Sequence, residues 1–366
     1  MDIYNKFKPN LIPNSDVSNP IDLKSIIGNK ASDYIISFKK DGCRVEFVNG
    51  KILSRALKPV TSLWIQQRYQ KLAEKCKELD IILEGEFYAH GYRFNEIVRY
   101  FKTEDVTDQK HVKKLLKLEE SGKLASEWPG RSVEWLSTYH AELKVWPFDV
   151  LLLNHPEMDY YTRMKWLFSH IIYPNGLLHE FKDILEVGDW YNIPIPDGFG
   201  AQTSTTIGTF SAIEDLYEHA LNSGYEGLVF ANRNRTYKFN RSTEKDNHLF
   251  KMKEDKNEYD GEILDILEGT VAREDAPKTV NELGRSVTSK LQEDREPSGL
   301  AKGILTTYNG FELTVSLEGF DHDELREFLA NKKDYIGKWI KYTGMAPTKN
   351  VPRHAHFSKG NWRDEK

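Results

Sequence analysis

Cysteine is scarce in this sequence, with only Cys43 and Cys76 among 366 residues. Two thiols cannot build a disulfide framework, and these two lack the paired spacing of a structural zinc site. We therefore expect a reducing compartment and no structural zinc. The chain also has no apolar run of the roughly 18 to 20 residues that a membrane span needs, and no apolar signal-peptide core near Met1. These absences predict a cytoplasmic protein with no membrane partner.

An excess of positive charge is also missing, because 51 Lys and Arg face 56 Asp and Glu, for a net charge of -5. Taken as a whole, that balance argues against a nucleic-acid partner. The charge is unevenly spread, however. Residues 338–366 hold seven basic and two acidic residues, and residues 231–256 hold eight basic and four acidic ones. These two basic stretches make a polyanionic partner plausible again.

What is present is a mixed pattern of strands and helices. Residues 34–38 form a β-prone run, and Asn49-Gly50 lies between two more, which predicts a hairpin. Apolar residues at steps of three and four predict a helix within residues 61–79 with Cys76 on its buried face, and a charged helix is expected over 107–121. The order of these elements predicts an α+β fold.

Past residue 256 the pattern changes to short strands and one helix near residues 323–329, which suits a small oligonucleotide-binding (OB) barrel. We therefore predict two domains, 1–256 and 257–366, with a hinge around Asp260. Residues 271–300 are polar and show little periodicity, so we expect either a functional loop or a tolerated insertion.

The segment Lys39-Lys40-Asp41-Gly42-Cys43-Arg44 follows the first β-prone run. A lysine at the end of a buried strand can be held rigidly and desolvated, which lowers its pKa toward that of a usable amine nucleophile. The same letters also suit an ordinary surface turn. The segment alone leaves both interpretations open.

Two later segments contain residues suited to holding a phosphate. Lys251 and Lys253 alternate along a predicted strand, so both ammonium groups can point to one side. The carboxylate of Glu226 offers the oxygen ligand that Mg²⁺ prefers. Each segment could also be an ordinary edge or turn, and the coincidence of all of them in order is what indicates a site.

Further motifs follow Lys39-x-Asp41-Gly42-x-Arg44 along the chain. They are Ser54-Arg55, Leu83-Glu84-Gly85-Glu86-Phe87, the run Val145 to Leu152, Tyr225-Glu226-Gly227-Leu228-Val229 and Leu249-Phe250-Lys251-Met252-Lys253. In this order they resemble the covalent nucleotidyltransferases, the superfamily of ATP-dependent DNA ligases, RNA ligases and capping enzymes. The segments Arg353 to Phe357 and Arg363 to Lys366 resemble the end of a DNA ligase, so the sequence looks like a minimal, bacteriophage-type, two-domain ATP-dependent DNA ligase.

The resemblance implies an adenylation (nucleotidyltransferase) domain of antiparallel sheets with helices, followed by a C-terminal OB-fold β-barrel. It also implies a role for each matching residue. Lys39 is the nucleophile, Lys251 and Lys253 grip the α-phosphate, Arg44, Glu86, Phe148, Arg363 and Lys366 contact the nucleotide, Glu226 binds the metal and Arg55 contacts the nick phosphate. Two positions depart from the usual pattern. Ser37 stands where many DNA ligases have an acidic residue. The last motif usually reads Arg-x-Asp-Lys, whereas here Asp364 directly follows Arg363 and Lys366 comes two residues after Asp364.

The implied cofactors are ATP and Mg²⁺ (or Mn²⁺), the implied partner is nicked duplex DNA, and a monomer is expected. Lys39 would form lysyl-AMP, pass AMP to the 5′-phosphate of a nick, and leave the 3′-hydroxyl to displace it. An RNA ligase or a capping-type nucleotidyltransferase is the nearest alternative, because the first motif is shared. A non-catalytic OB-fold DNA-binding protein is the alternative from another class.

Overall fold

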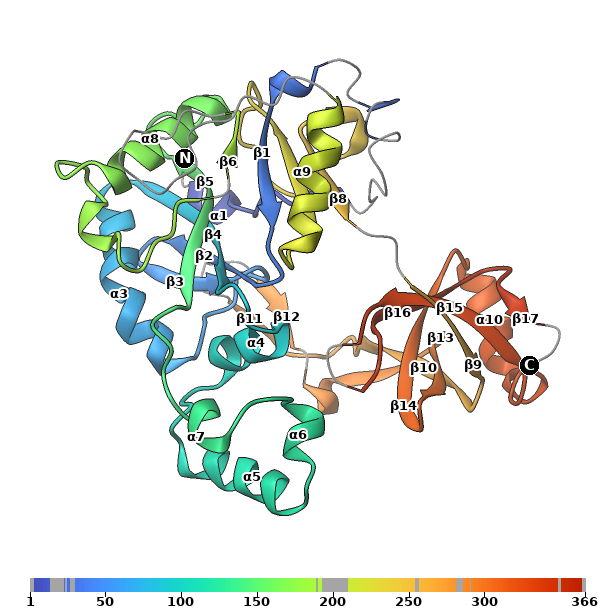
Figure 1. Cartoon of the computed structure of the whole chain (residues 1–366). Helices are drawn as coiled ribbons and strands as arrows, with labels where there is room; N and C mark the ends of the chain where they lie inside the picture. Colours follow the sequence, from blue (N-terminus) through green and yellow to red (C-terminus); the bar gives the residue numbers. More distant parts are fainter. Residues whose placement is uncertain are drawn as a thin grey trace. The chain divides into compact units, whose positions relative to one another are not determined.

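The computed structural model describes most of the chain (Figure 1). The described residues are 3–13, 23, 25–26, 30–188, 190–192, 210–253, 257–280, 286–289, 291–347 and 350–363. The chain divides into two compact units, Met1–Asp108 with Ser137–Glu254 and Gln109–Leu136 with Asp255–Lys366. The domain limits 1–256 and 257–366 stay a prediction, because their boundary adjoins residues 254–256, which lie outside the described part. No helix among the described residues is long and apolar enough to cross a membrane.

One sheet of the first unit carries Lys39 at the end of a strand. Its strands, in spatial order, are β6 (Trp190–Tyr191), β1 (Tyr34–Lys39), β7 (Gly227–Asn232) and β8 (Leu249–Lys253). All pairings are antiparallel, and the register aligns Lys39 with Gly227 and Gly227 with Lys253. Helix α9 (Phe210–Asn222) packs its apolar face against buried side chains of β1 and β7.

A second antiparallel sheet completes the framework of this unit. Its strands, in spatial order, are β3 (Lys51–Ser54), β2 (Cys43–Val48), β4 (Ile81–Tyr88) and β5 (Lys144–Leu152). The predicted hairpin is confirmed: Asn49 and Gly50 connect β2 to β3 with φ of +50° and +76°, both in the left-handed region that a type I′ turn requires.

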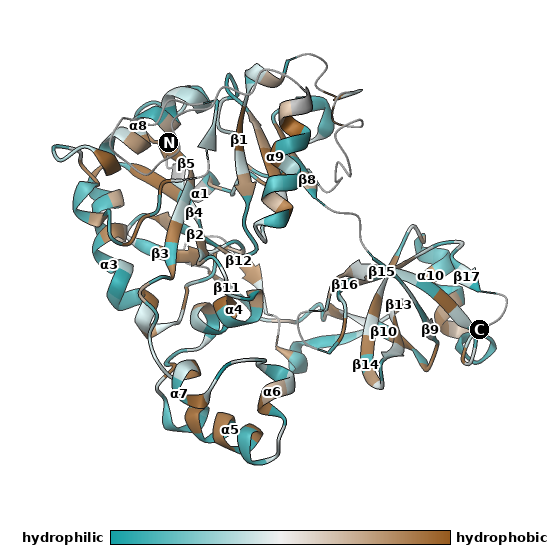
Figure 2. Cartoon of the chain, in the orientation of Figure 1, coloured by the Kyte–Doolittle hydropathy of each residue, from teal (hydrophilic) through white to brown (hydrophobic). Residues whose placement is uncertain are grey.

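Helix α3 (Leu63–Glu78) confirms the predicted amphipathic helix next to this sheet. The side chain of Ser62 accepts a hydrogen bond from the backbone of Ile65 and caps its first turn. Cys76 is fully buried in the core, as predicted from the apolar spacing. The side of α3 away from the sheet is largely hydrophilic (Figure 2).

The remaining helices of the first unit are short or pack on the second sheet. Helix α8 (Tyr160–Ile172) packs against β5 and buries Met164, Leu167 and Phe168. The elements are α1 (Ile3–Lys6), α4 (Phe94–Lys102) and α8 (Tyr160–Ile172), with the 3-10 turns η1 (Ala31–Asp33), η2 (His179–Phe181) and η3 (Glu244–Asp246).

Between α4 and β5 lies a helical insertion with a small core of its own. It consists of α5 (Gln109–Glu120), α6 (Leu124–Glu127) and α7 (Val133–Leu136). Leu115, Leu124, Trp128, Val133 and Leu136 form this core. The charged helix expected over 107–121 is therefore confirmed, and Gly122 follows it with a φ of +70°.

The C-terminal residues form a curled sheet that agrees with the predicted OB-fold barrel. Ile263 donates a backbone hydrogen bond to Lys338, and the next residue, Leu264, donates one to Leu305 on the opposite edge, so one bent strand joins both edges. The strands are β9 (Asn257–Glu262), β10 (Asp265–Ala272), β13 (Arg295–Tyr308), β14 (Phe311–Glu318), β15 (Trp339–Met345), β16 (Arg353–Ser358) and β17 (Trp362–Arg363). Helix α10 (His322–Ala330) and η5 (Lys332–Asp334) lie between β14 and β15.

Asp260 itself lies within β9 and pairs with Lys341 of β15. The hinge around it stays a prediction, because residues 254–256 lie outside the described part. Residues 271–300 contain paired strands that the sequence did not predict, because β10 and β13 continue into them and pair as far as Ala272 and Arg295. Polar side chains hid this pairing, since a ribbon exposed on both faces has no apolar alternation to reveal it. The ribbon also includes β11 (Lys278–Val280), β12 (Ser286–Thr288) and η4 (Gln292–Asp294). Whether the region is a functional loop or a tolerated insertion stays open.

Candidate active site

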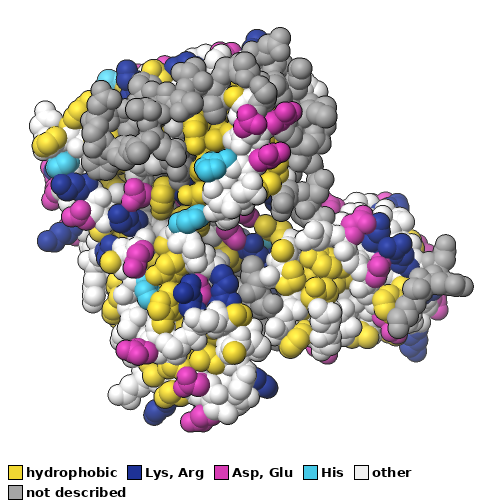
Figure 3. All heavy atoms as spheres, viewed as in Figure 1, with side chains coloured by type: hydrophobic (Ala, Val, Ile, Leu, Met, Phe, Trp, Pro, Cys, Tyr) yellow, Lys and Arg dark blue, Asp and Glu magenta, His cyan; other side chains and the backbone are white. Residues whose placement is uncertain are grey.

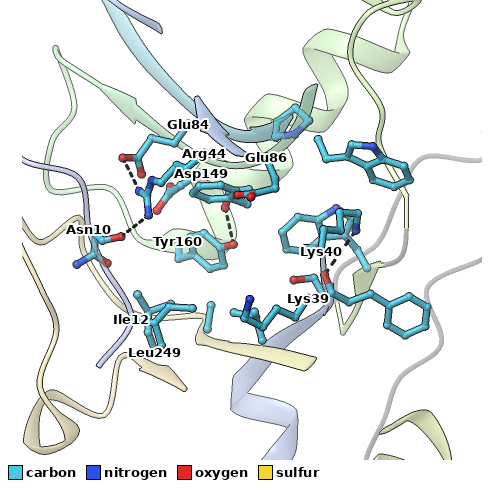
Figure 4. Close-up of a pocket in the computed structure, with 18 of the residues that line it drawn as sticks. Asn10, Ile12, Lys39, Lys40, Arg44, Glu84, Glu86, Asp149, Tyr160 and Leu249 are labelled. Atoms are coloured by element: carbon cyan, nitrogen blue, oxygen red, sulfur yellow. Dashed lines mark hydrogen bonds and ion pairs between the residues drawn. The ribbon is translucent and has the colours of Figure 1, made fainter. Parts of the chain in front are cut away.

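A cavity of about 160 Å³ lies between the two sheets of the first unit. Strands β1, β7 and β8 supply one wall, and β2, β4 and β5 supply the other. Apolar and aromatic side chains alternate there with a few charged ones (Figure 4). Four of the residues predicted from the sequence line this one cavity: Lys39, Arg44, Glu86 and Phe148.

Lys39 lies where β1 ends, and its ammonium forms an ion pair with the carboxylate of Glu226. The backbone NH of Glu226 also donates to the carbonyl of Lys39 at 2.9 Å, which holds the two residues opposite each other. Their side chains are 23% and 14% exposed, so the pair is half-buried but can be reached by a ligand. The structure thus joins the predicted nucleophile to the predicted metal-binding carboxylate.

The expected lowering of the Lys39 pKa is wrong for this arrangement. Burial does disfavour the charged ammonium, but the carboxylates of Glu226, Glu86 and Asp41 outweigh it and raise the pKa of Lys39 above its ordinary value. Sequence reasoning considered desolvation alone, and the carboxylates come from three separate segments. Lys39 therefore stays protonated until something weakens its contact with Glu226.

The other two predicted lysines lie on the same sheet as Lys39. Lys251 and Lys253 are half-buried while Met252 between them is fully buried, which confirms that both lysines point to one side of β8. In the register, Lys253 is separated from Lys39 by Gly227 alone. A Cβ on Gly227, whose φ is +137°, would lie 2.0 Å from the carbonyl oxygen of Met252, so only glycine lets β7 and β8 pair this closely.

Glu86 lies on β4 and faces the cavity from the opposite wall (Figure 4). Burial raises the pKa of Glu86 to about 7, against the lowering influence of Lys39 and Arg44. Gly42 makes room for this carboxyl, because a Cβ there would lie 2.8 Å from Cγ of Glu86 and 2.5 Å from the carbonyl oxygen of Phe87. The glycine of the first motif is therefore required for close packing beside Glu86.

Arg44 and Phe148 form the inner part of the cavity. The Arg44 guanidinium lies 4.8 Å from the centre of the Phe148 ring. It donates to Glu46 at 2.6 Å, to Glu84 at 2.8 Å and to the backbone carbonyl of Asn10 at 3.1 Å. Two carboxylates thus compete for one guanidinium, and burial together with Glu84 raises the pKa of Glu46 well above its ordinary value.

A buried charge network that the sequence did not reveal continues from this point. Asp149, next to Phe148, accepts from Arg163 at 2.9 and 3.0 Å and from Arg235 at 2.8 Å. Arg235 donates in turn to the side chain of Asn10 at 3.0 Å. Asp149, Arg163 and Arg235 are each less than 5% exposed.

Tyr237 ties this network back to Arg44. Its hydroxyl donates to Glu84 at 2.7 Å and accepts from the backbone NH of Asn10 at 3.3 Å. One signal of the network was visible in the sequence: Arg163 falls on the apolar face of its helix, between Tyr160 and Leu167. Nothing in the sequence indicated Asn10, because it lies far from every motif and is brought in only by the fold.

Glu226, Lys251 and Lys253 adjoin Lys39 without lining the cavity, and Arg55 and Arg363 do not line it either. Arg55 directly follows Ser54, the last residue of β3, and burial together with Arg241 and Arg44 lowers its pKa. Arg363 belongs to the second unit and forms an ion pair with Asp260 at 2.8 Å. Lys366 lies outside the described residues.

The acidic groups near Lys39 fit a weakly held hard cation. Among the described residues there is no cluster of three or more His, Cys, Asp or Glu side chains that could hold a metal ion by itself. Mg²⁺ usually binds through one or two carboxylates plus phosphate oxygens and water, which is what Glu226 and Glu86 beside three lysines provide. The donor set therefore suits a cation that arrives with a phosphate ligand.

The two sheets that enclose this cavity and carry Lys39, Lys251 and Lys253 form a mixed α and β domain of the nucleotidyltransferase type. A curled sheet compatible with an OB fold follows it. The family model for the ATP dependent DNA ligase domain matches residues 18–253, which is 236 of 366 residues. The chain belongs to this family.

A solved structure with a TM-score above 0.5 supports the fold, and two others are reported beside it. A Lig E DNA ligase structure is 16% identical with a TM-score of 0.53 and covers 97% of this chain and 99% of its own. The DNA ligase-adenylate of Chlorella virus is 19% identical with a TM-score of 0.43, and the match covers 97% of this chain and 100% of the viral one. The ATP-dependent DNA ligase of bacteriophage T7 in complex with ATP is 19% identical with a TM-score of 0.43, and the match covers 99% of this chain and 100% of the phage one. Among curated proteins the sequence finds no significant match.

Proposed function

We propose that this chain seals nicks in duplex DNA by joining a 5′-phosphate to a 3′-hydroxyl at the expense of ATP. The observation that carries the proposal is the position of Lys39, at the end of a strand in the cavity between the two sheets, paired with Glu226 and aligned with Lys253. Nick sealing of this kind would serve DNA replication, repair and recombination. A cytoplasmic monomer remains part of the proposal.

In the first step Nζ of Lys39 attacks the α-phosphorus of ATP, a P–N bond forms, the bond to the β-phosphate oxygen breaks, and pyrophosphate leaves. Lys39 must first lose a proton, and Glu226 is the carboxylate in contact with Nζ. A divalent cation bound at Glu226 would supply charge neutralisation there and for the phosphate. Lys251 and Lys253 would stabilise the negative charge that develops on the phosphate oxygens.

In the second and third steps AMP passes to the 5′-phosphate of the nick, and the 3′-hydroxyl displaces it. The lysine amine leaves in the second step and AMP leaves in the third, so Lys39 returns to its starting state. Arg55 is proposed to contact the nick phosphate, and Arg363 with Lys366 to contact ATP. Phe148 and Glu86 would hold the adenine and the ribose in place during the first two steps.

Covalent labelling with radiolabelled ATP tests the proposal most directly. We expect a label on the chain that disappears in Lys39→Ala, and we expect GTP and NAD to give little label under the same conditions. Sealing assays on nicked DNA and nicked RNA then compare the two substrates. A chain that takes no label from ATP, or that seals only RNA, would refute the proposal.

The ribbon over residues 271–300 is proposed to contact the duplex. Because Ala272 and Arg295 are a paired position, residues 273–294 can be replaced by a two-residue Asn-Gly turn without disturbing the rest of β10 and β13. We expect this deletion to weaken binding to nicked DNA and to leave self-adenylylation intact. Unchanged affinity for the nick would show that the ribbon has no such role.

A further inference from the structure

Helix α5 of the insertion carries four lysines on one face. Lys110, Lys113, Lys114 and Lys117 follow the spacing i, i+3, i+4 and i+7. At 3.6 residues per turn they fall within about 100° of the helix circumference. None of the sequence motifs includes these residues, and the proposed chemistry does not use them.

The lysine face points away from the core of the insertion. Val112, Leu115 and Leu118 pack into that core from the opposite side of the helix. All four lysines are exposed. Lys113, Lys114 and Lys117 form no ion pair with any other residue that the structure describes.

This arrangement of charge works against the stability of the helix itself. Lysines three and four residues apart repel one another, and Lys110 and Lys113 lie in the first two turns, where the helix dipole disfavours positive charge. The two acidic residues, Glu119 and Glu120, lie at the other end, where the dipole disfavours negative charge. A helix that served only to support its neighbours would be more stable with acidic residues near its start and basic residues near its end. The lysine face therefore indicates a ligand.

The excess of positive charge on the insertion is local. Figure 3 shows both acidic and basic side chains on the face of the molecule that it draws. The insertion, residues 109–136, contains six Lys and Arg and four Asp and Glu, a local charge of +2 in a chain of net charge -5. Its excess of positive charge is concentrated on one side of α5.

We propose that the lysine face of α5 binds the sugar–phosphate backbone of the duplex on which the ligase acts; the inference rests on the proposed function. From Lys110 to Lys117 the helix rises about 10 Å, which matches about three steps from phosphate to phosphate along one strand, at 3.4 Å of axis per step. Such contacts add affinity for DNA of any sequence.

The composition of the face favours duplex DNA over other anionic partners. Binding of single strands relies on aromatic side chains on which bases stack, and the lysine face has none. A membrane-surface helix buries an apolar face in lipid, and the apolar face of α5 is already used by its own core. Of these partners, duplex DNA fits best, because its regularly spaced phosphates can pair with four regularly spaced ammonium groups.

The test compares salt dependence of binding to nicked duplex DNA. In the triple variant Lys113→Gln, Lys114→Gln, Lys117→Gln, the slope of log affinity against log salt should become less steep by about 3, at about 0.9 per lost phosphate contact. The matched control is Lys71→Gln, Lys165→Gln, Lys182→Gln, which removes the same charge from three scattered, exposed lysines. It should leave the slope close to that of the parent chain.

Self-adenylylation separates this inference from the proposed function. Labelling of Lys39 by ATP needs no DNA, so it should be equal in the parent chain and in both triple variants. If the chain labels and seals nicks but the α5 variant and the scattered variant have the same salt slope, the lysine face is not a DNA-binding surface. If the parent chain neither labels nor seals, the proposed function itself has failed. Stronger binding by Glu119→Gln, Glu120→Gln would further support the inference.

Discussion

The two ends of the pocket hold their positive charges in different ways. At the inner end, Arg44, Arg163 and Arg235 are shared among Glu46, Glu84 and Asp149, with every pair at 2.6 to 3.0 Å. At the outer end, Lys39 forms an ion pair with Glu226 and lies in line with Lys253. The first arrangement is nearly closed to solvent, and the second is partly open.

The difference follows from the chemistry of the two cations. A guanidinium keeps its charge at any relevant pH and offers several donors in a fixed plane, so it suits a permanent network. A lysine can lose its proton and become a nucleophile, provided that its partner can be withdrawn. The inner end therefore holds the walls in position while the outer end can change its state of charge.

Breaking the inner network at its centre should have the largest effect. Asp149→Asn leaves Arg163 and Arg235 buried without a full counter-charge, so we expect a loss of about 3–5 kcal/mol in the free energy of unfolding. Urea unfolding measures it. Asp275→Asn is the matched control, because Asp275 pairs with Arg273 on the surface and its loss should cost less than about 1 kcal/mol.

The same variant has a distinct pH dependence. Burial opposes ionisation of Asp149, but Arg163 and Arg235 outweigh it and hold its pKa below the ordinary 3.8. Its contribution to stability is therefore complete above pH about 4 and is lost as the pH falls through the folded-state pKa. Equal acid sensitivity in the parent chain and Asp149→Asn would contradict this account of the network.

At the outer end, removing a charge should stabilise the fold. The pKa of Glu86 is about 7 in the folded chain against an ordinary 4.5, so the folded state binds more protons between these values and loses stability as the pH rises. The free energy of unfolding of Glu86→Gln should thus exceed that of the parent chain by up to about 3 kcal/mol at pH 8. At pH 4 the two chains should hardly differ in stability. Self-adenylylation should fall at the same time.

Thermal unfolding at pH 4 and pH 8 measures the change in stability, and labelling with ATP measures the change in self-adenylylation. Glu74→Gln, an exposed position on α3, serves as the control and should show no pH-dependent difference. A Glu86→Gln chain that is less stable at pH 8 than the parent would reverse the proposed contrast between the two ends.

The smallest effect is expected where the network meets the pocket. Tyr237→Phe removes the hydroxyl that donates to Glu84 and accepts from Asn10, which should cost about 1–2 kcal/mol in unfolding. Because Glu84 also holds Arg44, labelling should need more ATP to reach half of its maximal rate. Tyr173→Phe, an exposed tyrosine, is the control. Unchanged ATP dependence would mean that the network supports the fold without positioning Arg44.

Local patterns were sufficient for much of the fold. The Asn49-Gly50 turn, the α3 helix and the strand ending in Lys39 follow from short-range periodicity and turn chemistry, which act over a few residues. The paired ribbon around Ala272 and Arg295 did not follow from such patterns. Both of its faces are polar, so neither periodicity nor burial marks its register.

The sequence by itself determined which residues could take part: a lysine after a strand, a carboxylate suited to a metal ion, and two lysines that alternate along β8. Only the tertiary structure decided the electrostatics. The pKa of Lys39 is raised rather than lowered because Glu226, from a distant segment, lies against it. Charges interact through space with a strength that depends on distance and burial, and neither quantity is encoded in the spacing of residues along the chain.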